Sequence, residues 1–175
     1  MDNFYDARTL PQQIANLVDR SMEVKKRTLL GAPIAEEKLK EAVMKLGVPL
    51  PKSFETFLLR YGGGMIFGYE IHGIPSEATR ISKFDGSGAT GNTTETDNFV
   101  TSIVRANQYL NRRLPQHFVE FTSNLGDYTF HFDTSRMNEA KECPVVVWGP
   151  GCESIPVAQD FLDFLRKISE DTLVF

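Results

Sequence analysis

The sequence lacks the patterns that mark a membrane-spanning, exported or disulfide-rich protein. None of its apolar runs approaches the roughly 18–20 residues that a membrane helix needs. The opening residues, MDNFYDARTLPQQ, lack the basic and apolar regions of a secretory signal. Its two cysteines, Cys143 and Cys152, do not form a CxxC pair. We therefore expect a cytoplasmic protein with reduced thiols.

The short motifs of the common enzyme classes are also missing. The sequence contains no P-loop, no nucleophile elbow and no HExxH pair. Residues 86–91, GSGATG, match the glycine pattern of a dinucleotide loop, but polar sequence on both sides favours a flexible loop. His72 and His117 have no acidic or cysteine partner at ligand spacing. We therefore expect no cofactor, no metal ion and no catalytic residues.

Basic residues are too few for a typical nucleic-acid-binding protein. The 19 Lys and Arg are outnumbered by 23 Asp and Glu, which gives a net charge of −4. The acidic excess falls in residues 61–175, which hold nine basic and fifteen acidic residues, whereas residues 1–60 have a small basic excess. A continuous acidic face would attract a basic partner, whereas scattered acidic charge would only keep the protein soluble.

Hydrophobic periodicity predicts helices in the first part of the chain and mainly strands further on. Helices are expected over about 9–30, 34–47 and 51–61, the last ending at Gly62, Gly63 and Gly64. The pattern then predicts one strand over 65–74, a long polar loop over 75–97 and a helix over about 97–115.

The last part of the chain completes an α+β pattern. HFVEFTS (117–123) and YTFHFD (128–133) predict a hairpin, and CPVVVWG (143–149) predicts a central strand covered on both faces. VAQDFLDFLRKI (157–168) predicts a final helix. This order indicates a single α+β domain with one mostly antiparallel sheet and helices packed around it.

One stretch, NLGDYTFHFD (124–133), carries candidates for chemistry. Strand alternation places its aromatic residues on one face and Asp127, Thr129, His131 and Asp133 on the other. The two carboxylates lie about 20 Å apart at roughly 3.3 Å per residue, too far to share one metal ion. We interpret this polar face as the solvent side of a half-buried strand. Two alternatives to a solvent side are a partner-binding face and the active site of a hydrolase that uses Asp127 or His131.

Several motifs occur in a recognisable order. An LP step precedes an aromatic-rich helix and a glycine pair, and these are followed by a G-D-aromatic strand, a P-V-apolar-Trp strand and an A-x-x-F-x-x-F-L helix. This order resembles the SUKH superfamily of cell-wall-assembly-regulator-like and toxin-immunity proteins. The similarity covers about 34–168, so 34–175 is the expected SUKH-like domain and 1–33 a helical extension packed on it. The residues that carry the motifs, all interpreted as structural, are Leu50, Pro51, Gly62, Gly63, Gly126, Asp127, Asp133 and Trp148.

The resemblance implies a non-enzymatic binding protein. Bacterial members look like immunity proteins that bind and block a toxin, often a nuclease, and such a toxin tends to be basic because its substrate is nucleic acid. The expected partner is therefore a basic toxin domain, not nucleic acid or a membrane, and the expected state is a monomer or weak homodimer. A regulatory scaffold for cell-wall or signalling assembly is the alternative. The candidate contact residues are Glu70, Asp85, Glu95 and Asp97.

Overall fold

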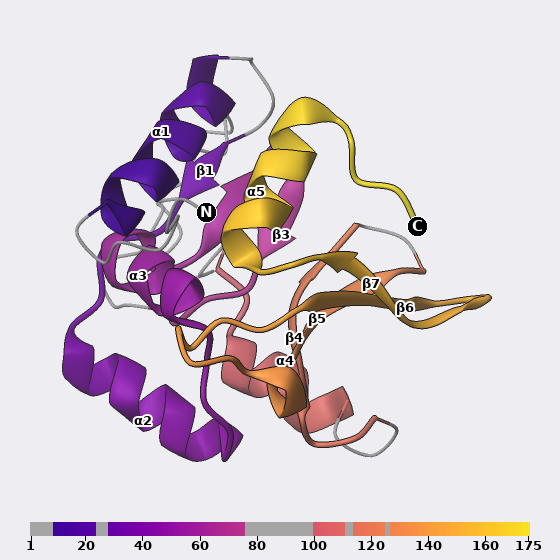
Figure 1. Cartoon of the computed structure of the whole chain (residues 1–175). Helices are drawn as coiled ribbons and strands as arrows, with labels where there is room; N and C mark the ends of the chain where they lie inside the picture. Colours follow the sequence, from indigo (N-terminus) through magenta and orange to yellow (C-terminus); the bar gives the residue numbers. More distant parts are fainter. Residues whose placement is uncertain (1–8, 24–27, 76–99, 111–113, 125–126) are drawn as a thin grey trace, which may run out of the picture.

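The helices and strands form one sheet with helices packed around it (Figure 1). The computed structural model describes residues 9–23, 28–75, 100–110, 114–124 and 127–175. No helix among these residues is long and apolar enough to cross a membrane. The elements in chain order are α1 (Leu10–Glu23), β1 (Leu29–Leu30), α2 (Glu36–Leu46), α3 (Lys52–Tyr61), β2 (Gly64–Ile66), β3 (Tyr69–Ile71), α4 (Ile103–Leu110), β4 (Phe118–Ser123), β5 (Thr129–Asp133), the 3-10 helix η1 (Thr134–Arg136), β6 (Val145–Gly149), β7 (Cys152–Ala158) and α5 (Phe161–Glu170).

The seven strands lie in the sheet in the order in which they occur in the chain. Each pairs antiparallel with the next, from β1 to β7. This arrangement confirms the predicted α+β class with a single antiparallel sheet. β6 lies between β5 and β7, and three successive valines, Val145 to Val147, are all buried. Because neighbouring side chains point to opposite faces, β6 is covered on both faces, as its unbroken apolar run predicts.

The core is an aromatic cluster between the sheet and the helices α1, α3 and α5. Phe121 on β4 stacks on Phe132 on β5 with ring centroids 4.1 Å apart. Phe54 of α3 lies 4.9 Å from Phe132 and 5.0 Å from Phe161 of α5. The aromatic parity of the 128–133 segment therefore marks the core face correctly. α1 packs on α3 and α5 and adds a second layer over this face (Figure 1).

Helix α3 is held at its start by a distant carboxylate and ends in a tight glycine turn. Pro51 is its N-cap and supplies no side-chain cap. Instead the backbone N–H and the hydroxyl of Ser53 each donate to the Glu142 carboxylate, both at 2.7 Å. At the other end Gly62 has a φ of 66°, as the predicted helix stop requires. A Cβ on Gly73 would collide with the Gly62 carbonyl oxygen, so this turn is packed against its neighbour without room for a side chain.

Two predictions for the first half of the chain are wrong in detail. The expected helix over 9–30 ends at Glu23 among the described residues, and Leu29 and Leu30 instead form β1, paired with β2. The single strand expected over 65–74 is a hairpin of β2 and β3, turned at Phe67 and Gly68, which both have positive φ. Strands of two or three residues are too short to show the period of two on which the prediction depends.

Two predictions for the second half also need correction. α4 begins at Ile103, not near 97, because Val100 and Thr101 are not helical. The sequence predicts no strand at β7 and places its last two residues, Val157 and Ala158, in the final helix, which instead begins at Phe161. Pro156 interrupts the strand pattern, and proline is tolerated there because β7 lies at the edge of the sheet. The long loop expected over 75–97 lies outside the described residues apart from Pro75.

Candidate functional site

The structure places only one of the four candidate contact residues. Glu70 lies on β3, half-buried, and its carboxylate accepts a hydrogen bond from the Thr101 hydroxyl. Asp85, Glu95 and Asp97 lie outside the described residues. The proposed acidic contact surface is therefore represented in the structure by Glu70 alone.

The motif residues interpreted as structural occupy different environments. Leu50 is buried in the core next to α3. Asp133 ends β5, is buried, and accepts a hydrogen bond of 2.6 Å from the Ser135 hydroxyl. Trp148 is half-buried on β6, with its ring 6.1 Å from that of Phe118. Asp127 is exposed before β5, and Gly126 lies outside the described residues.

The polar face of β5 is not the solvent side that the sequence predicts. The exposed fraction is 1% for His131 and 7% for Asp133. His131 pairs across the sheet with Glu120 on one side and Val146 on the other, and the Phe118 ring lies nearby. These large neighbours enclose the imidazole. Strand alternation correctly separates the aromatic face of β5 from its polar face. It could not show that other parts of the protein cover the polar face.

Three buried polar side chains, His72, Glu120 and His131, meet on this face, and we call them the buried polar trio. The His72 Nδ1 lies 3.9 Å from a carboxylate oxygen of Glu120. The Nε2 atom of the His131 ring lies 2.8 Å from the Thr129 hydroxyl. Within the described residues, His72 Nδ1, one Glu120 carboxylate oxygen and His131 Nδ1 have no hydrogen-bond partner. The trio thus keeps unpaired polar atoms inside the protein.

Burial shifts the pKa values of the trio away from their ordinary values. It raises the pKa of Glu120 to about 7. Burial, and secondly the nearby His72, lower the pKa of His131 to about 4. Burial also lowers the pKa of His72, although the Glu70 charge acts in the opposite direction. Both imidazoles are therefore neutral near pH 7, where Glu120 is partly protonated.

The neighbouring helix α4 is anchored directly to β4. The Asn107 side chain accepts a hydrogen bond from the Glu120 backbone N–H and donates one to the Glu120 carbonyl oxygen, both at 2.9 Å. β3 pairs with β4 only at Thr122 and Ser123, so it does not reach Glu120. Asn107 therefore supplies the hydrogen-bond partners of the Glu120 backbone. No feature of the helical pattern singles out this asparagine from sequence alone.

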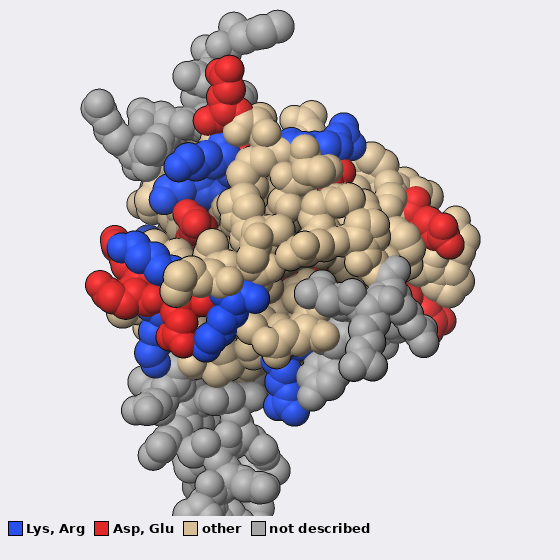
Figure 2. Space-filling model, turned by 90° about the horizontal axis from the view of Figure 1, so that it is seen from below, with Lys and Arg blue, Asp and Glu red and all other residues tan. Residues whose placement is uncertain are grey.

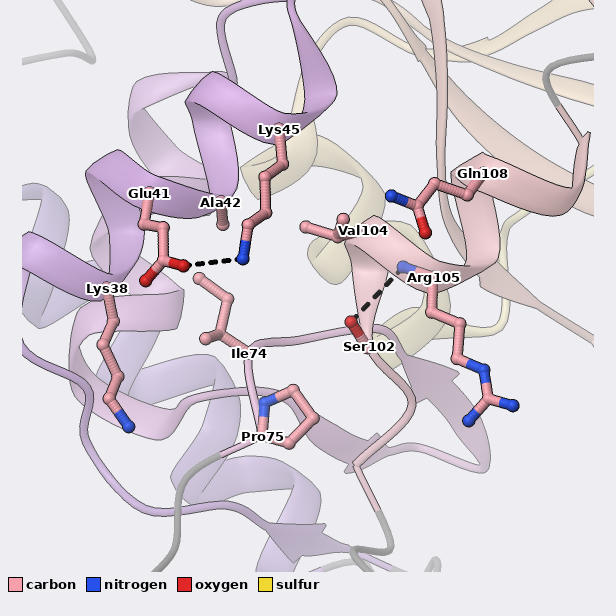
Figure 3. Close-up of a pocket in the computed structure, with 10 residues that line it drawn as sticks. All are labelled: Lys38, Glu41, Ala42, Lys45, Ile74, Pro75, Ser102, Val104, Arg105 and Gln108. Carbon is pink, nitrogen blue, oxygen red and sulfur yellow. Dashed lines mark hydrogen bonds and ion pairs between the residues drawn. The ribbon is translucent and has the colours of Figure 1, made fainter.

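A hollow of about 520 Å³ lies between α2 and α4, and we call it the α2–α4 pocket (Figure 3). The apolar side chains of Ala42, Ile74 and Val104 lie at its centre. Three cationic residues, Lys38, Lys45 and Arg105, and one carboxylate, Glu41, line it. Sequence reasoning missed this pocket because its two walls are far apart in the chain. The one available signal was the spacing of Lys38 and Lys45, seven residues apart on one side of a helix.

Charges of both signs are mixed on the side of the molecule that carries α2. Figure 2 shows basic and acidic side chains of the described residues interspersed there. Two pairs on α2 account for part of this pattern: Glu36 with Lys40 at 3.9 Å and Glu41 with Lys45 at 2.6 Å. No group of three or more His, Cys, Asp or Glu within the described ranges could hold a metal ion.

Comparison with known proteins identifies the family of this chain. No curated protein matches it. The model of the SMI1 / KNR4 family (SUKH-1) matches residues 33–167, which include α2 and the first seven residues of α5 but exclude α1 and β1. The match covers most of the chain and the same ordered motifs on which the resemblance rests. The chain therefore belongs to the SMI1 / KNR4 family (SUKH-1).

Proposed function

We propose that this protein is a toxin-immunity protein, which binds a basic toxin domain stoichiometrically and blocks it without catalysis. The observation that carries the proposal is the family match over residues 33–167. The acidic excess of residues 61–175 supports a basic partner, and a nuclease toxin tends to be basic because its substrate is anionic.

A binding role accounts better than a hydrolase activity for the environments of Asp127 and His131. A catalytic group must come within hydrogen-bond reach of its substrate. The His131 ring is enclosed on the sheet, whereas Asp127 is exposed outside the strand. These environments favour a packing role for His131 and a turn role for Asp127.

The electrostatic part of the proposal concerns the rate of association. Glu70 presents its carboxylate beside Thr101, and Asp85, Glu95 and Asp97 precede Thr101 in the sequence. Complementary charge mainly accelerates encounter, and salt screens it with a Debye length of about 8 Å at physiological ionic strength. Binding to a basic toxin should therefore slow as salt rises, while dissociation changes less.

The proposal is tested by growth protection and by binding kinetics. The chain is co-expressed with a basic toxin domain taken from a gene that neighbours its own, and we expect it to restore growth. In vitro, Asp85→Lys/Glu95→Lys should lower the association rate severalfold with an unchanged melting temperature. Glu139→Lys/Glu153→Lys, at two exposed positions in another part of the chain, makes the same total change in charge and is the control. Absence of protection would reject the immunity role, and an association rate insensitive to both salt and charge reversal would reject the acidic surface.

A regulatory scaffold is the second candidate, and one observation favours it. The α2 wall of the α2–α4 pocket carries Lys38 and Lys45 but one carboxylate, Glu41, and this basic wall suits an acidic protein segment better than a basic toxin. Failure to protect against the toxin, together with binding of an acidic partner in this pocket, would support the scaffold role.

A further inference from the structure

We propose that two copies of this chain associate through α2, with Met44 of each copy inserted in a groove of the other. The groove is a hollow of about 420 Å³ between α2 and α3, and we call it the α2–α3 groove. α2 lies on the outside of the molecule, beside α3 (Figure 1). This inference goes beyond the toxin-binding proposal and does not depend on it.

The α2–α3 groove suits an apolar occupant. Its apolar lining next to Met44 consists of three side chains, Leu39, Val43 and Leu59. Each wall also carries one ion pair, Glu36 with Lys40 at 3.9 Å and Lys52 with Glu55 at 3.5 Å. The charges that line the groove are therefore balanced within the protein. An apolar side chain gains from entering such a groove, whereas a charged one would lose water without gaining a partner.

Met44 is an uncovered apolar side chain at the rim of this groove. Its exposed fraction is 78%, and every other exposed residue of α2 is Lys or Glu. Met44 therefore borders the groove without filling it. Methionine is flexible and polarizable, so it packs well into an irregular apolar hollow. The solvent face of α2 thus presents one side chain that association would bury.

A groove and a protruding side chain on the same patch match the needs of a two-fold dimer. In such a dimer the same patch of both copies meets, so the patch must be complementary to itself. Met44 and the α2–α3 groove lie next to each other on α2 and supply both shapes. One two-fold axis then fills two grooves and covers two methionines.

The charges at the ends of α2 are complementary in the same arrangement. Its first turn carries Glu36 and Glu37, and its last turn carries Lys45. A two-fold axis perpendicular to the helix makes the two copies of α2 antiparallel. The acidic first turn of each copy then lies toward the basic last turn of the other, and the two helix dipoles also oppose each other. Such complementarity fixes the orientation of the pair.

The test is sedimentation equilibrium of the full chain from about 10 μM to about 1 mM, because an interface of so few elements belongs to the small, weak class. We expect the average mass to rise with concentration from that of one chain toward that of two. Dilution of the ¹⁵N-labelled chain locates the contact by NMR. The amide signals that should shift are those of Leu39, Val43, Met44 and Leu59.

A pair of methionine variants gives the matched comparison. Met44→Glu should weaken association by about tenfold or more, because it would bring a charge into an apolar groove. Met22→Glu makes the same substitution at another exposed position, on α1, and should leave the association constant within about twofold of the parent value. Retained melting temperatures would show that both variants remain folded.

A pair of charge variants tests the antiparallel arrangement. Glu37→Lys makes both ends of α2 basic, and Lys45→Glu makes both ends acidic, so each should weaken self-association by about threefold or more. An equimolar mixture of the two variants should associate as tightly as the parent chain, because each basic end then meets an acidic one.

Four results would overturn the inference. The average mass could stay that of one chain up to about 1 mM, or Met44→Glu and Met22→Glu could have equal effects. The concentration-dependent shifts could map away from α2 and α3, or the mixture of charge variants could fail to restore association. Growth protection against the toxin is measured separately, so the two proposals can fail independently.

Discussion

Glu120 and His131 face each other across β4 and β5, and burial shifts their pKa values in opposite directions. The lowered pKa of His131 gives a stability contribution that is present above about pH 6.5 and is lost as pH falls toward 4. The raised pKa of Glu120 gives a contribution that is present below about pH 4.5 and is lost as pH rises toward 7. Between pH 4.5 and 6.5 the two effects oppose each other, so together they leave little pH dependence.

Glu120→Gln should expose this hidden compensation. The Gln amide cannot titrate, so the variant keeps only the stability loss that His131 causes as pH falls. The free energy of unfolding should therefore decrease more steeply with acidification than in the parent protein. The added slope is at most about 1.4 kcal/mol per pH unit between pH 6.5 and 4.5. Glu70 is present in both proteins. Loss of the Glu120 carboxylate beside His72 favours the neutral His72 imidazole, which acts in the same direction as the expected change. Urea unfolding at a series of pH values measures the slope.

The exposed Glu139→Gln is the control, and its slope should equal that of the parent protein. At pH 7 and above Glu120→Gln should be as stable as the parent or more so, because it avoids a buried charge. Parallel stability curves for Glu120→Gln and the parent would contradict the compensation.

At the scale of single elements, the start of α3 depends on a residue far along the chain. Glu142 has an exposed fraction of 2% and accepts both hydrogen bonds from Ser53. In most helices this role falls to the N-cap side chain, which Pro51 lacks here. The start of α3 is therefore stabilised by a tertiary contact and not by its N-cap residue.

Glu142→Ala should destabilise the protein by about 1–3 kcal/mol, because it leaves the two Ser53 donors unpaired in a buried place. Chemical denaturation measures the change. Glu139→Ala, three residues earlier and exposed, should stay within about 0.5 kcal/mol of the parent. An equal effect of the two substitutions would mean that the carboxylate does not cap the helix.

The elements that could be predicted from sequence are those whose signals are local. α2, α3 and β6 follow from helical or apolar runs with glycine or proline at their ends. β1 and β7 escape prediction because a two-residue strand and a strand containing Pro156 depend on pairing with neighbours. The α2–α4 pocket and the buried polar trio escape it for the same reason. The pocket and the trio each combine residues from separate elements, and no spacing within the sequence predicts that these residues lie close together.

At the scale of the whole molecule, the family match and the folded unit have different boundaries. The match begins at residue 33. β1 nevertheless pairs with β2, and α1 buries Leu10, Ile14 and Val18 against the rest of the protein. A chain that begins at residue 33 would leave the β2 edge unpaired and part of the core open to water.

The truncated chain 33–175 should therefore lose cooperative unfolding, which calorimetry and the dispersion of NMR signals would report. Two point variants separate the packing of α1 from its mere presence. Ile14→Ala should cost about 2–4 kcal/mol, because its side chain is 1% exposed. Met22→Ala, at an exposed position on the same helix, should cost less than about 0.5 kcal/mol. A truncated chain that melts cooperatively at the parent temperature would show that α1 and β1 are dispensable.

The contact between α1 and α5, the first and the last helices described, has a consequence for synthesis on the ribosome (Figure 1). The seven strands can pair one after another as they emerge, because each bonds to its neighbour in the chain. α1 emerges before all of them, yet one of its two helical neighbours is translated last. Its apolar side chains therefore stay partly uncovered while the whole sheet is being made. Chaperones that recognise nascent chains would have that interval in which to bind α1.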